Sequence, residues 1–301
     1  MTRKYAVVAA ALTTDPREAP TIARTLGFDG LLFDAFSADL DIPSLSATGL
    51  REFRHVLSAQ DRQLVGLRVD LGAKGFGPGA DVDRLLSQFD RVLQSAAGLG
   101  SPLVCVEAGP LPDPPPESKP KPKVTPEQAG LILIPTLSAP PTPEETHAEQ
   151  PPPKIDPVFV AQVDGAMAEL GRIADRYSAI VAFGSDLASF AAVDRALTAA
   201  RCPWFGIDLD PVAILRDEWE IDEIFSRLGP LIRHVRARDA IRGADRRTKP
   251  ATIGRGDTKW DHLLSNLDGA AYHGWITLDP TELTNRLNAA TAGVKFLKLH
   301  E

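Results

Sequence analysis

Short apolar runs alternate with segments of helical periodicity along most of the chain. Each apolar run is short enough for a buried strand, and the segment after it repeats apolar residues at helical spacing, as Leu50, Phe53 and Leu57 do in residues 46–59. The predicted strands are residues 5–12, 30–34, 64–70, 102–107, 179–183, 203–208, 231–235 and 275–278. The predicted helices are residues 15–26, 46–59, 81–99, 158–177, 187–200, 211–228, 261–267 and 281–299.

Local signals mark several helix ends. Asp15 and Pro16 are typical of a helix start, and Gly27 and Gly100 are typical of helix ends. Eight strand-and-helix units in about 250 residues predict a (β/α)8 barrel. An open doubly wound sheet is the alternative, but no G-x-G-x-x-G follows the first strand.

A proline-rich insertion interrupts the alternation after the fourth strand. Residues 110–157 contain sixteen of the chain's 26 prolines, and proline removes a backbone donor and fixes φ. We therefore predict one barrel domain, residues 1–301, with an insertion at residues 110–156. We interpret the insertion as a loop tethered over the surface. Its apolar island, AGLILIPTL, could pair with the barrel, and display to a proline-binding partner is the less favoured alternative.

Composition excludes several classes of protein. A formal net charge of -7 argues against affinity that depends on neutralising many phosphates, so no nucleic-acid partner is expected. Cys105 and Cys202 lie in apolar runs and predict core thiols in a reducing compartment. The apolar residues 5–12 lead directly into Thr-Asp-Pro, which favours a first strand over a leader, and no run approaches about 18 apolar residues. We expect a cytoplasmic protein with no membrane partner.

Charged residues gather where the predicted strands end, the edge at which (β/α)8 barrels bind ligands. The stretch LIRHVRARDAIRGADRRTKPATIGRGD, residues 231–257, shows this most clearly, because an apolar strand runs into mixed charges and two glycines. No G-x-S-x-G or Cys-His nucleophile pattern occurs. The candidates at strand ends are Asp34, Arg68, Asp70, Glu107, Asp208 or Asp210, Arg236, Arg238 and Asp279.

Five sequence pieces, in order along the chain, resemble a known family. They are ARTLGFDGLLFDA, WFGIDLDP, HVRARDA, IGRGDTKWDHLL and YHGWITLDPTE. Together they resemble the xylose isomerase-like TIM barrels, which include sugar and sugar-phosphate isomerases and epimerases and the endonuclease IV type of repair enzyme. The resemblance implies a (β/α)8 fold, a carbohydrate ligand and a divalent metal such as Mn, Mg, Zn or Co.

The chain departs from the metal site that this resemblance implies. A typical member carries a glutamate after the fifth strand, an aspartate and a nearby histidine after the sixth, a histidine after the seventh and a glutamate after the eighth. Here Phe183 or Gly184 stands at the first position. Asp210 matches the aspartate, and Ala213 replaces the histidine three residues later.

The remaining two positions are occupied by Arg236, in place of a histidine, and Asp279, in place of the last glutamate. Arginine stays protonated and offers only donors, so it cannot ligate a cation. Two aspartates alone bind magnesium or manganese weakly. We therefore predict a degraded site with no metal cofactor. Asp210, Arg236 and Asp279 then form either a salt-bridged group or a remodelled ligand site, and the sequence favours neither.

Three functions remain open, as does the oligomeric state. The preferred one is a noncatalytic or altered barrel that binds a polar or anionic carbohydrate, such as a sugar phosphate. The second is an active isomerase or epimerase with Glu107 or Asp279 as base, and the third is a structural protein that binds partners through the insertion. The proposed substrate-binding residues are Asp210, Arg236, Arg238, His234, Arg255 and Arg68.

Two of these residues have competing interpretations. His234 shares a strand face with Arg236 and could contact a ligand, but a hydrogen-bonded core histidine is favoured. Arg238 shares that face only if the strand continues, and otherwise it pairs with Asp239 in solvent. For a phosphate ligand, Arg236, Arg238 and Arg255 would lie where (β/α)8 barrels often bind phosphate, near the last loops.

Overall fold

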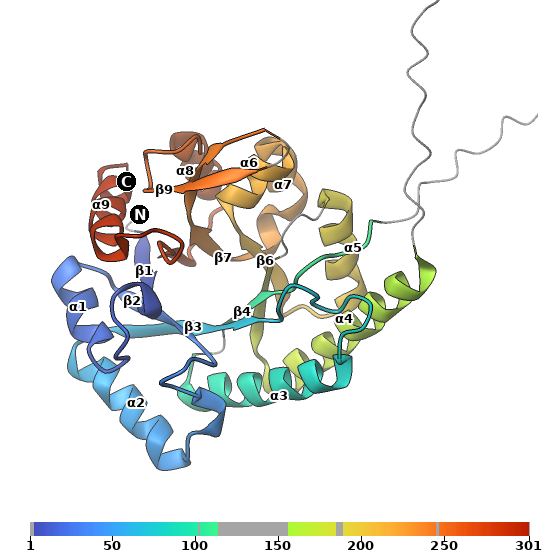
Figure 1. The fold of residues 1–301 in the computed structure, drawn as a ribbon, viewed down its shortest axis with the longest axis horizontal. Coiled ribbons are helices and arrows are strands. Elements are labelled where there is room, and N and C mark those ends of the chain that lie inside the picture. The colour runs from blue at the N-terminus through green and yellow to red at the C-terminus, as the bar shows by residue number, and fades with distance from the viewer. Residues whose placement is uncertain (1–2, 102, 114–155, 185–188, 245–246, 301) are drawn as a thin grey trace, which may run out of the picture.

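The computed structural model describes residues 3–101, 103–113, 156–184, 189–244 and 247–300, and these form a closed parallel barrel surrounded by helices (Figure 1). The strands pair in the order β1-β10-β7-β6-β5-β4-β3-β2, and β2 returns to β1. The predicted (β/α)8 barrel is therefore confirmed. The barrel strands are β1 (Lys4–Val8), β2 (Gly30–Asp34), β3 (Gln63–Asp70), β4 (Leu103–Glu107), β5 (Ile180–Gly184), β6 (Phe205–Leu209), β7 (Ile232–Ala237) and β10 (Trp275–Leu278).

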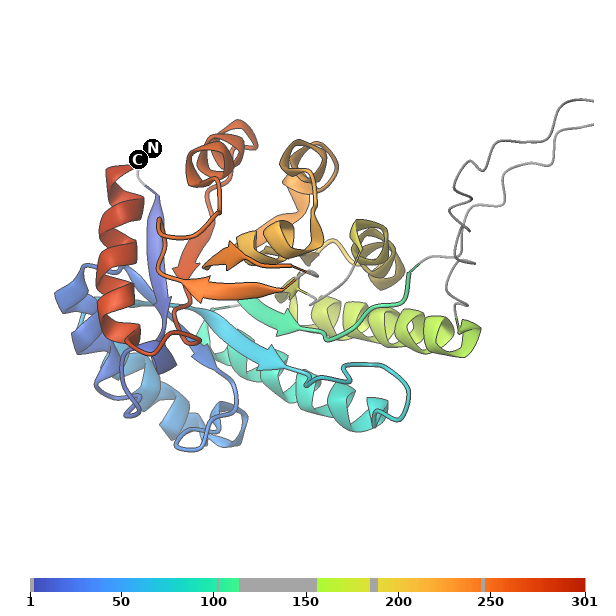
Figure 2. The same cartoon turned by 45° about the horizontal axis from the view of Figure 1, so that its top comes forward.

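Helices cover the outside of the barrel, as the turned view shows (Figure 2). The N-caps at Ser46 and Asp81 accept hydrogen bonds from backbone N–H groups of the first turn, and Gly27 ends its helix at a φ of 81°. The helices are α1 (Ala19–Leu26), α2 (Ala47–Ala59), α3 (Val82–Leu99), α4 (Pro157–Tyr177), α5 (Phe190–Ala200), α6 (Pro211–Asp217), α7 (Ile221–Leu228), α8 (Trp260–Gly269) and α9 (Arg286–Leu299). Short 3-10 turns are η1 (Ala9–Ala11), η2 (Ile42–Ser44) and η4 (Gly229–Leu231).

Three predicted helices differ from the observed ones. The first begins at Ala19 rather than at Asp15, because the Asp15 carboxylate forms a local turn by accepting the Arg17 N–H at 2.9 Å. The predicted helix 211–228 is two helices, α6 and α7, broken where Glu218 adopts a left-handed φ of 57°. The last helix begins at Arg286, five residues later than predicted.

A two-stranded hairpin after β7 was missed by the sequence analysis. Strands β8 (Asp239–Arg242) and β9 (Thr248–Ala251) pair antiparallel, and β8 lies beside α6 (Figure 1). Its four-residue strands expose Ile241, so they lack the apolar run that marked the barrel strands.

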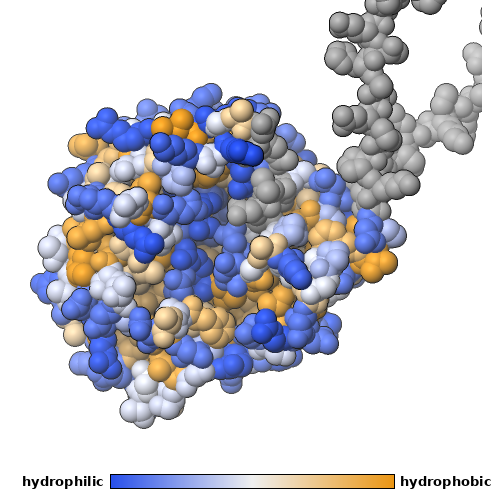
Figure 3. All heavy atoms as spheres, in the orientation of Figure 1, coloured by the Kyte–Doolittle hydropathy of each residue, from blue (hydrophilic) through white to orange (hydrophobic). Residues whose placement is uncertain are grey.

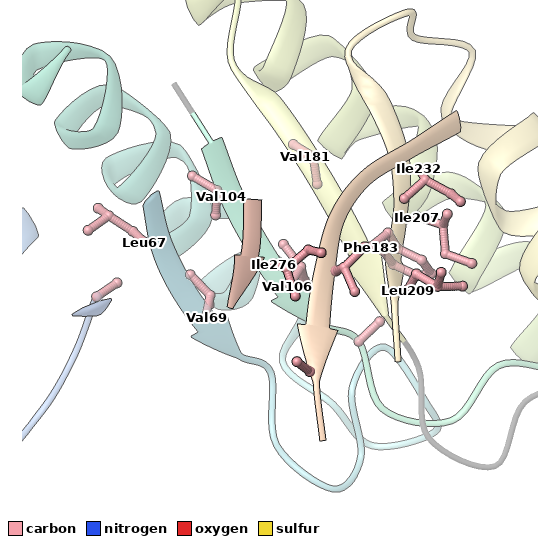
Figure 4. Packing of buried hydrophobic residues seen from close by; sticks show 14 of the residues in the cluster. Leu67, Val69, Val104, Val106, Val181, Phe183, Ile207, Leu209, Ile232 and Ile276 are labelled. Carbon is pink, nitrogen blue, oxygen red and sulfur yellow. The ribbon is translucent and has the colours of Figure 1, made fainter. Parts of the chain in front are cut away.

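Alternation along each barrel strand separates an apolar outer layer from a more polar interior. Figure 4 shows apolar side chains on β3, β4, β5 and β6 that belong to the core shared with the helices. Each such side chain removed from water contributes about 1.5–3 kcal/mol. The residues between them, such as Arg68 and Asp208, therefore take the opposite face and point into the barrel.

The predicted insertion, residues 110–156, lies for its greater part outside the described residues, so its structure stays a prediction. The same holds for the expectation of a single domain over residues 1–301. Within the described part of the chain, no helix combines the length and the apolar character needed to cross a membrane.

Candidate functional site

Charged side chains from several strands meet where the barrel strands end, and we call this group the barrel-mouth cluster. Strand alternation turns Asp34, Arg68, Glu107, Asp208 and Arg236 inward, because each follows an apolar residue of the outer core. The other members follow the ends of β6, β7 and β10. Figure 3 shows hydrophilic atoms gathered in the hollow near the middle of the visible face. The cluster consists of Asp34, Arg68, Glu107, Asp208, Asp210, Arg236, Arg238, Asp279 and Glu282.

Arg236 and Arg68 bind the same carboxylate. The Arg236 Nε donates to Asp279 Oδ2 at 2.7 Å, and the Arg68 Nη1 donates to the same oxygen at 2.7 Å. Arg236 also donates through Nη1 to Glu107 Oε2, while Arg68 Nε reaches Asp34 Oδ1 at 2.6 Å. Since β7 and β4 are not neighbours in the barrel, the Arg236–Glu107 pair crosses its interior. These four ion pairs tie five parts of the barrel mouth together.

The Asp279 carboxylate is fully buried, yet it remains ionised. Burial by itself raises its pKa, but the guanidinium groups of Arg236 and Arg68 and a hydrogen bond from Thr281 outweigh this effect and hold the pKa well below its ordinary value. The carboxylates of Asp279 and Glu107 raise the pKa of Arg236 in turn, against the effect of burial. Asp279 is therefore a weak base, poorly suited to removing a proton from carbon.

The lowered pKa of Asp279 makes the protein's stability depend on pH. Its stabilising contribution is fully present above the ordinary carboxyl pKa of about 3.9, and is lost as pH falls toward the lower pKa of the folded state. We expect the free energy of unfolding to decrease below about pH 4. Chemical denaturation across this range should show a smaller decrease in Asp279→Asn. An identical pH dependence in that variant would contradict the assignment.

Asp210 binds Arg238, which corrects the predicted grouping of Asp210 with Arg236. Arg238 donates through Nη2 to Asp210 and through Nη1 to Glu282 Oε1 at 2.7 Å. The other Asp210 oxygen accepts the Val212 N–H at 2.9 Å and caps α6. Burial raises the pKa of Asp210, but Arg238 and then Arg236 lower it further than burial raises it. Of the two alternatives that the sequence left open, the salt-bridged group therefore matches Arg236 and Asp279, with Glu107 and not Asp210 as the other carboxylate bound to Arg236.

Asp239 has a role that the sequence analysis did not foresee. Instead of pairing with Arg238 in solvent, Asp239 is 3% exposed, and its carboxylate accepts five hydrogen bonds from described residues. A Cβ on Gly256 would collide with this carboxylate, which explains why glycine stands there. Asp239 therefore fixes the connection from β9 to α8. The donors are the backbone N–H groups of Ala240, Gly254, Gly256 and Thr258 and the Trp260 Nε1.

His234 lies deeper in the barrel and is fully buried. Its Nδ1 is 2.7 Å from Asp208 Oδ1, and its Nε2 is 2.7 Å from Thr277 Oγ1. With both ring nitrogens bonded, the geometry favours the core histidine over a ligand contact. Within the described residues, Cys105, Asp208 and His234 form a possible metal-ligand group, with one donor atom from each within 4.8 Å. Cys105 is buried, as its apolar run predicts, but no pattern in the sequence brings these three residues together.

Arg255 lies apart from the other predicted site residues. It follows β9 in an exposed stretch, and its backbone N–H donates to Thr252 O at 2.8 Å. No hydrogen bond or ion pair between described residues joins its side chain to the barrel-mouth cluster. Of the eight residues predicted for catalysis or binding, the structure brings six into the cluster and places His234 directly beneath it.

Space in the barrel mouth is unevenly distributed. Beside Glu107 and Arg236 there is a cavity of only about 20 Å³, scarcely larger than one water molecule requires. At the ends of β1 and β2 lies a larger cavity of about 200 Å³, lined in part by Asp34. It adjoins a cleft of about 610 Å³, and Phe33, Asp39 and Leu40 line both. A ligand of sugar size therefore fits on the Asp34 side of the mouth.

Comparison with known proteins confirms the family resemblance. Residues 158–300 match the family described as xylose isomerase-like TIM barrel. No curated protein matches the sequence.

Solved structures match the whole fold at low identity. A xylose isomerase domain protein from Planctomyces limnophilus has a TM-score of 0.67 and 13% identity over 99% of this chain and 95% of its own. D-psicose 3-epimerase from Clostridium cellulolyticum H10, solved with D-tagatose, has a TM-score of 0.67 and 13% identity over 98% of both chains. D-allulose 3-epimerase from Methylomonas sp., in complex with D-allulose, has a TM-score of 0.63 and 14% identity over 99% of this chain and 97% of its own. At such identities the likeness shows the fold alone.

Proposed function

We propose that this xylose isomerase-like TIM barrel binds a polar carbohydrate in its mouth without the metal-dependent catalysis of its family. The observation that carries the proposal is Arg236, which lies between Glu107 and Asp279 at the position matching a ligand histidine of the family. The two epimerases of the same fold that were solved with D-tagatose and D-allulose support carbohydrate as the ligand class.

The residues at the family's ligand positions do not fit a divalent cation. Gly184 ends β5 and has no side chain to offer, and Ala213 lies in α6 with no donor atom. Asp210 and Asp279 keep their carboxylates, but arginines and backbone or hydroxyl donors bind both. A cation there would also meet the fixed positive charge of Arg236.

The buried group of Cys105, Asp208 and His234 is a poor substitute. Both His234 nitrogens already bond to Asp208 and Thr277. Burial and the charge of Asp208 raise the pKa of the Cys105 thiol well above its ordinary value, whereas a metal binds the thiolate. Neither set of residues therefore favours a resident metal.

An active isomerase with Glu107 or Asp279 as base is less well supported. Asp279 is a weak base because its pKa is lowered, and Glu107 is bound to Arg236. The arginines expected to take a phosphate, Arg236 and Arg238, each bind two carboxylates instead. Partner binding through the insertion stays a prediction, because that segment lies outside the described residues.

The proposal predicts sugar binding that does not require metal. After dialysis against a chelator, the protein should contain less than stoichiometric manganese, zinc or cobalt by elemental analysis, and D-allulose or D-tagatose should still bind in calorimetric titration. One retained equivalent of metal, or binding that is lost on chelation and restored by metal, would contradict it. Cys105→Ser is the control, because loss of a retained metal in this variant would place the metal in the buried group and not in the mouth.

A further inference from the structure

Carboxylates outnumber guanidinium groups in the barrel-mouth cluster. Among the described residues it contains six carboxylates and three arginines, so the balance of charge is negative. In three ion pairs of the cluster the carboxylate is also clearly more exposed than the arginine, whereas Asp279 is fully buried. The Asp34 side chain is 26% exposed against 18% for Arg68, and Glu107 is 24% exposed against 13% for Arg236. A ligand entering the mouth therefore meets negative charge first.

The same imbalance continues into the space beside Asp34. The cavity of about 200 Å³ is lined by the carboxylates of Asp34 and Asp39 and by one cationic side chain, Arg286. Arg286 Nη1 is directed to the Ala10 carbonyl at 3.5 Å. The adjoining cleft of about 610 Å³ adds Asp15 and Glu52 against Arg17. The charge at this end of the barrel is thus complementary to a cation.

One atom gives this region a specific anchor. Asp34 Oδ1 accepts the Arg68 Nε, while Oδ2 makes no hydrogen bond to any other residue that the structure describes. Phe33 and Leu40 provide apolar surface around it, as ligand pockets usually combine a few polar groups with apolar walls. An ammonium group could bind Asp34 Oδ2 while the body of the ligand packs along these walls.

We propose that the cavity at Asp34 selects a positively charged, polyhydroxylated ligand, an amino sugar, and disfavours sugar phosphates. This inference rests on the proposed carbohydrate function and narrows its ligand class. It replaces the expectation of an anionic carbohydrate, because the arginines that suggested a phosphate site are bound by carboxylates of the cluster. A phosphate group would have to displace these carboxylates while facing Asp34 and Asp39.

Three derivatives of the same hexose ring test the charge preference. Glucosamine, N-acetylglucosamine and glucose 6-phosphate carry a positive, a neutral and a negative group, provided that the pH keeps the amine protonated. Calorimetric titration of the full chain at low salt should give the tightest binding for glucosamine. Equal affinity for glucosamine and N-acetylglucosamine, or tighter binding of glucose 6-phosphate, would overturn the charge preference alone. Failure of all three sugars and of D-allulose and D-tagatose to bind would overturn the proposed function as well.

Two variants test whether the preference for glucosamine depends on the carboxylates of this cavity. Asp34→Asn should weaken glucosamine binding about tenfold, the effect of losing one charge-assisted hydrogen bond, and should leave N-acetylglucosamine binding nearly unchanged. Since Asp34 also pairs with Arg68, the exposed Asp39→Asn provides a second test that leaves this ion pair intact, with a smaller loss. Asp61→Asn is the matched control, because it makes the same change in net charge just before β3, at the opposite end of the barrel. A preference unchanged in both cavity variants would overturn the site.

Discussion

Replacing Arg236 with alanine is expected to lower the free energy of unfolding by about 3–5 kcal/mol, the usual effect of removing one partner from a buried ion pair. The Arg236 side chain is 13% exposed, and it bonds to Glu107 and to the fully buried Asp279. Its removal leaves Asp279 bound to Arg68 alone among the described arginines, and leaves Glu107 without this guanidinium. Chemical denaturation near neutral pH, where both carboxylates are ionised in the unfolded chain, measures the loss.

Arg227→Ala is the matched control for this prediction. Arg227 also bonds to two carboxylates, those of Asp194 and Glu223, but its side chain is 46% exposed. Exposed pairs typically contribute less than about 1 kcal/mol. If Arg236→Ala lowered the free energy of unfolding by no more than Arg227→Ala does, the ion pairs of Arg236 in the barrel-mouth cluster would not stabilise the fold as their distances and burial indicate.

The sequence predicted most of the residues that reach the barrel mouth, because strand alternation is a local property, but it also pointed to Asp70 and Arg255, which lie outside the cluster. Once the apolar residues of β3 and β7 are assigned to the outer core, Arg68 and Arg236 must point inward. Their partners could not be predicted in the same way. Arg236 and Glu107 are 129 positions apart and meet across the barrel interior, so the pair depends on how closely the strands and side chains pack. The expected partner, Asp210, is instead turned toward Arg238 and α6.

Errors in the element boundaries also have a physical cause. The predicted helix from 211 to 228 has apolar residues at suitable spacing on both sides of the break, and the break depends on one residue, Glu218, in a left-handed conformation that glutamate rarely adopts. The β8–β9 hairpin was missed because its strands are short and partly polar. The loop after the hairpin donates to a single buried carboxylate, Asp239, whose neighbours in the sequence give no sign of these donors.

Asp239→Ala is expected to destabilise the protein by about 3 kcal/mol or more, although it removes no ion pair. Four backbone N–H groups and the Trp260 Nε1 lose their acceptor together, and the site is buried, with Asp239 and Trp260 each 3% exposed. A buried donor without a partner typically costs about 1–3 kcal/mol, and water entering the loop would recover part of that cost. Denaturation and native-state amide exchange measure the global and the local effect.

The amide exchange experiment separates an anchoring role from general destabilisation. If Asp239 fixes the loop, the N–H groups of Gly254 and Gly256 should exchange much faster in Asp239→Ala than in the wild type. The exchange rates of N–H groups in the distant strand β3 should change only as far as the global free energy of unfolding changes. Asp257→Ala is the control, since this exposed carboxylate accepts one hydrogen bond, from the Arg242 N–H at 2.7 Å, and its loss should cost less than about 1 kcal/mol. Equal costs for the two variants, or unchanged exchange at both glycines, would show that the loop is held by its packing and not by Asp239.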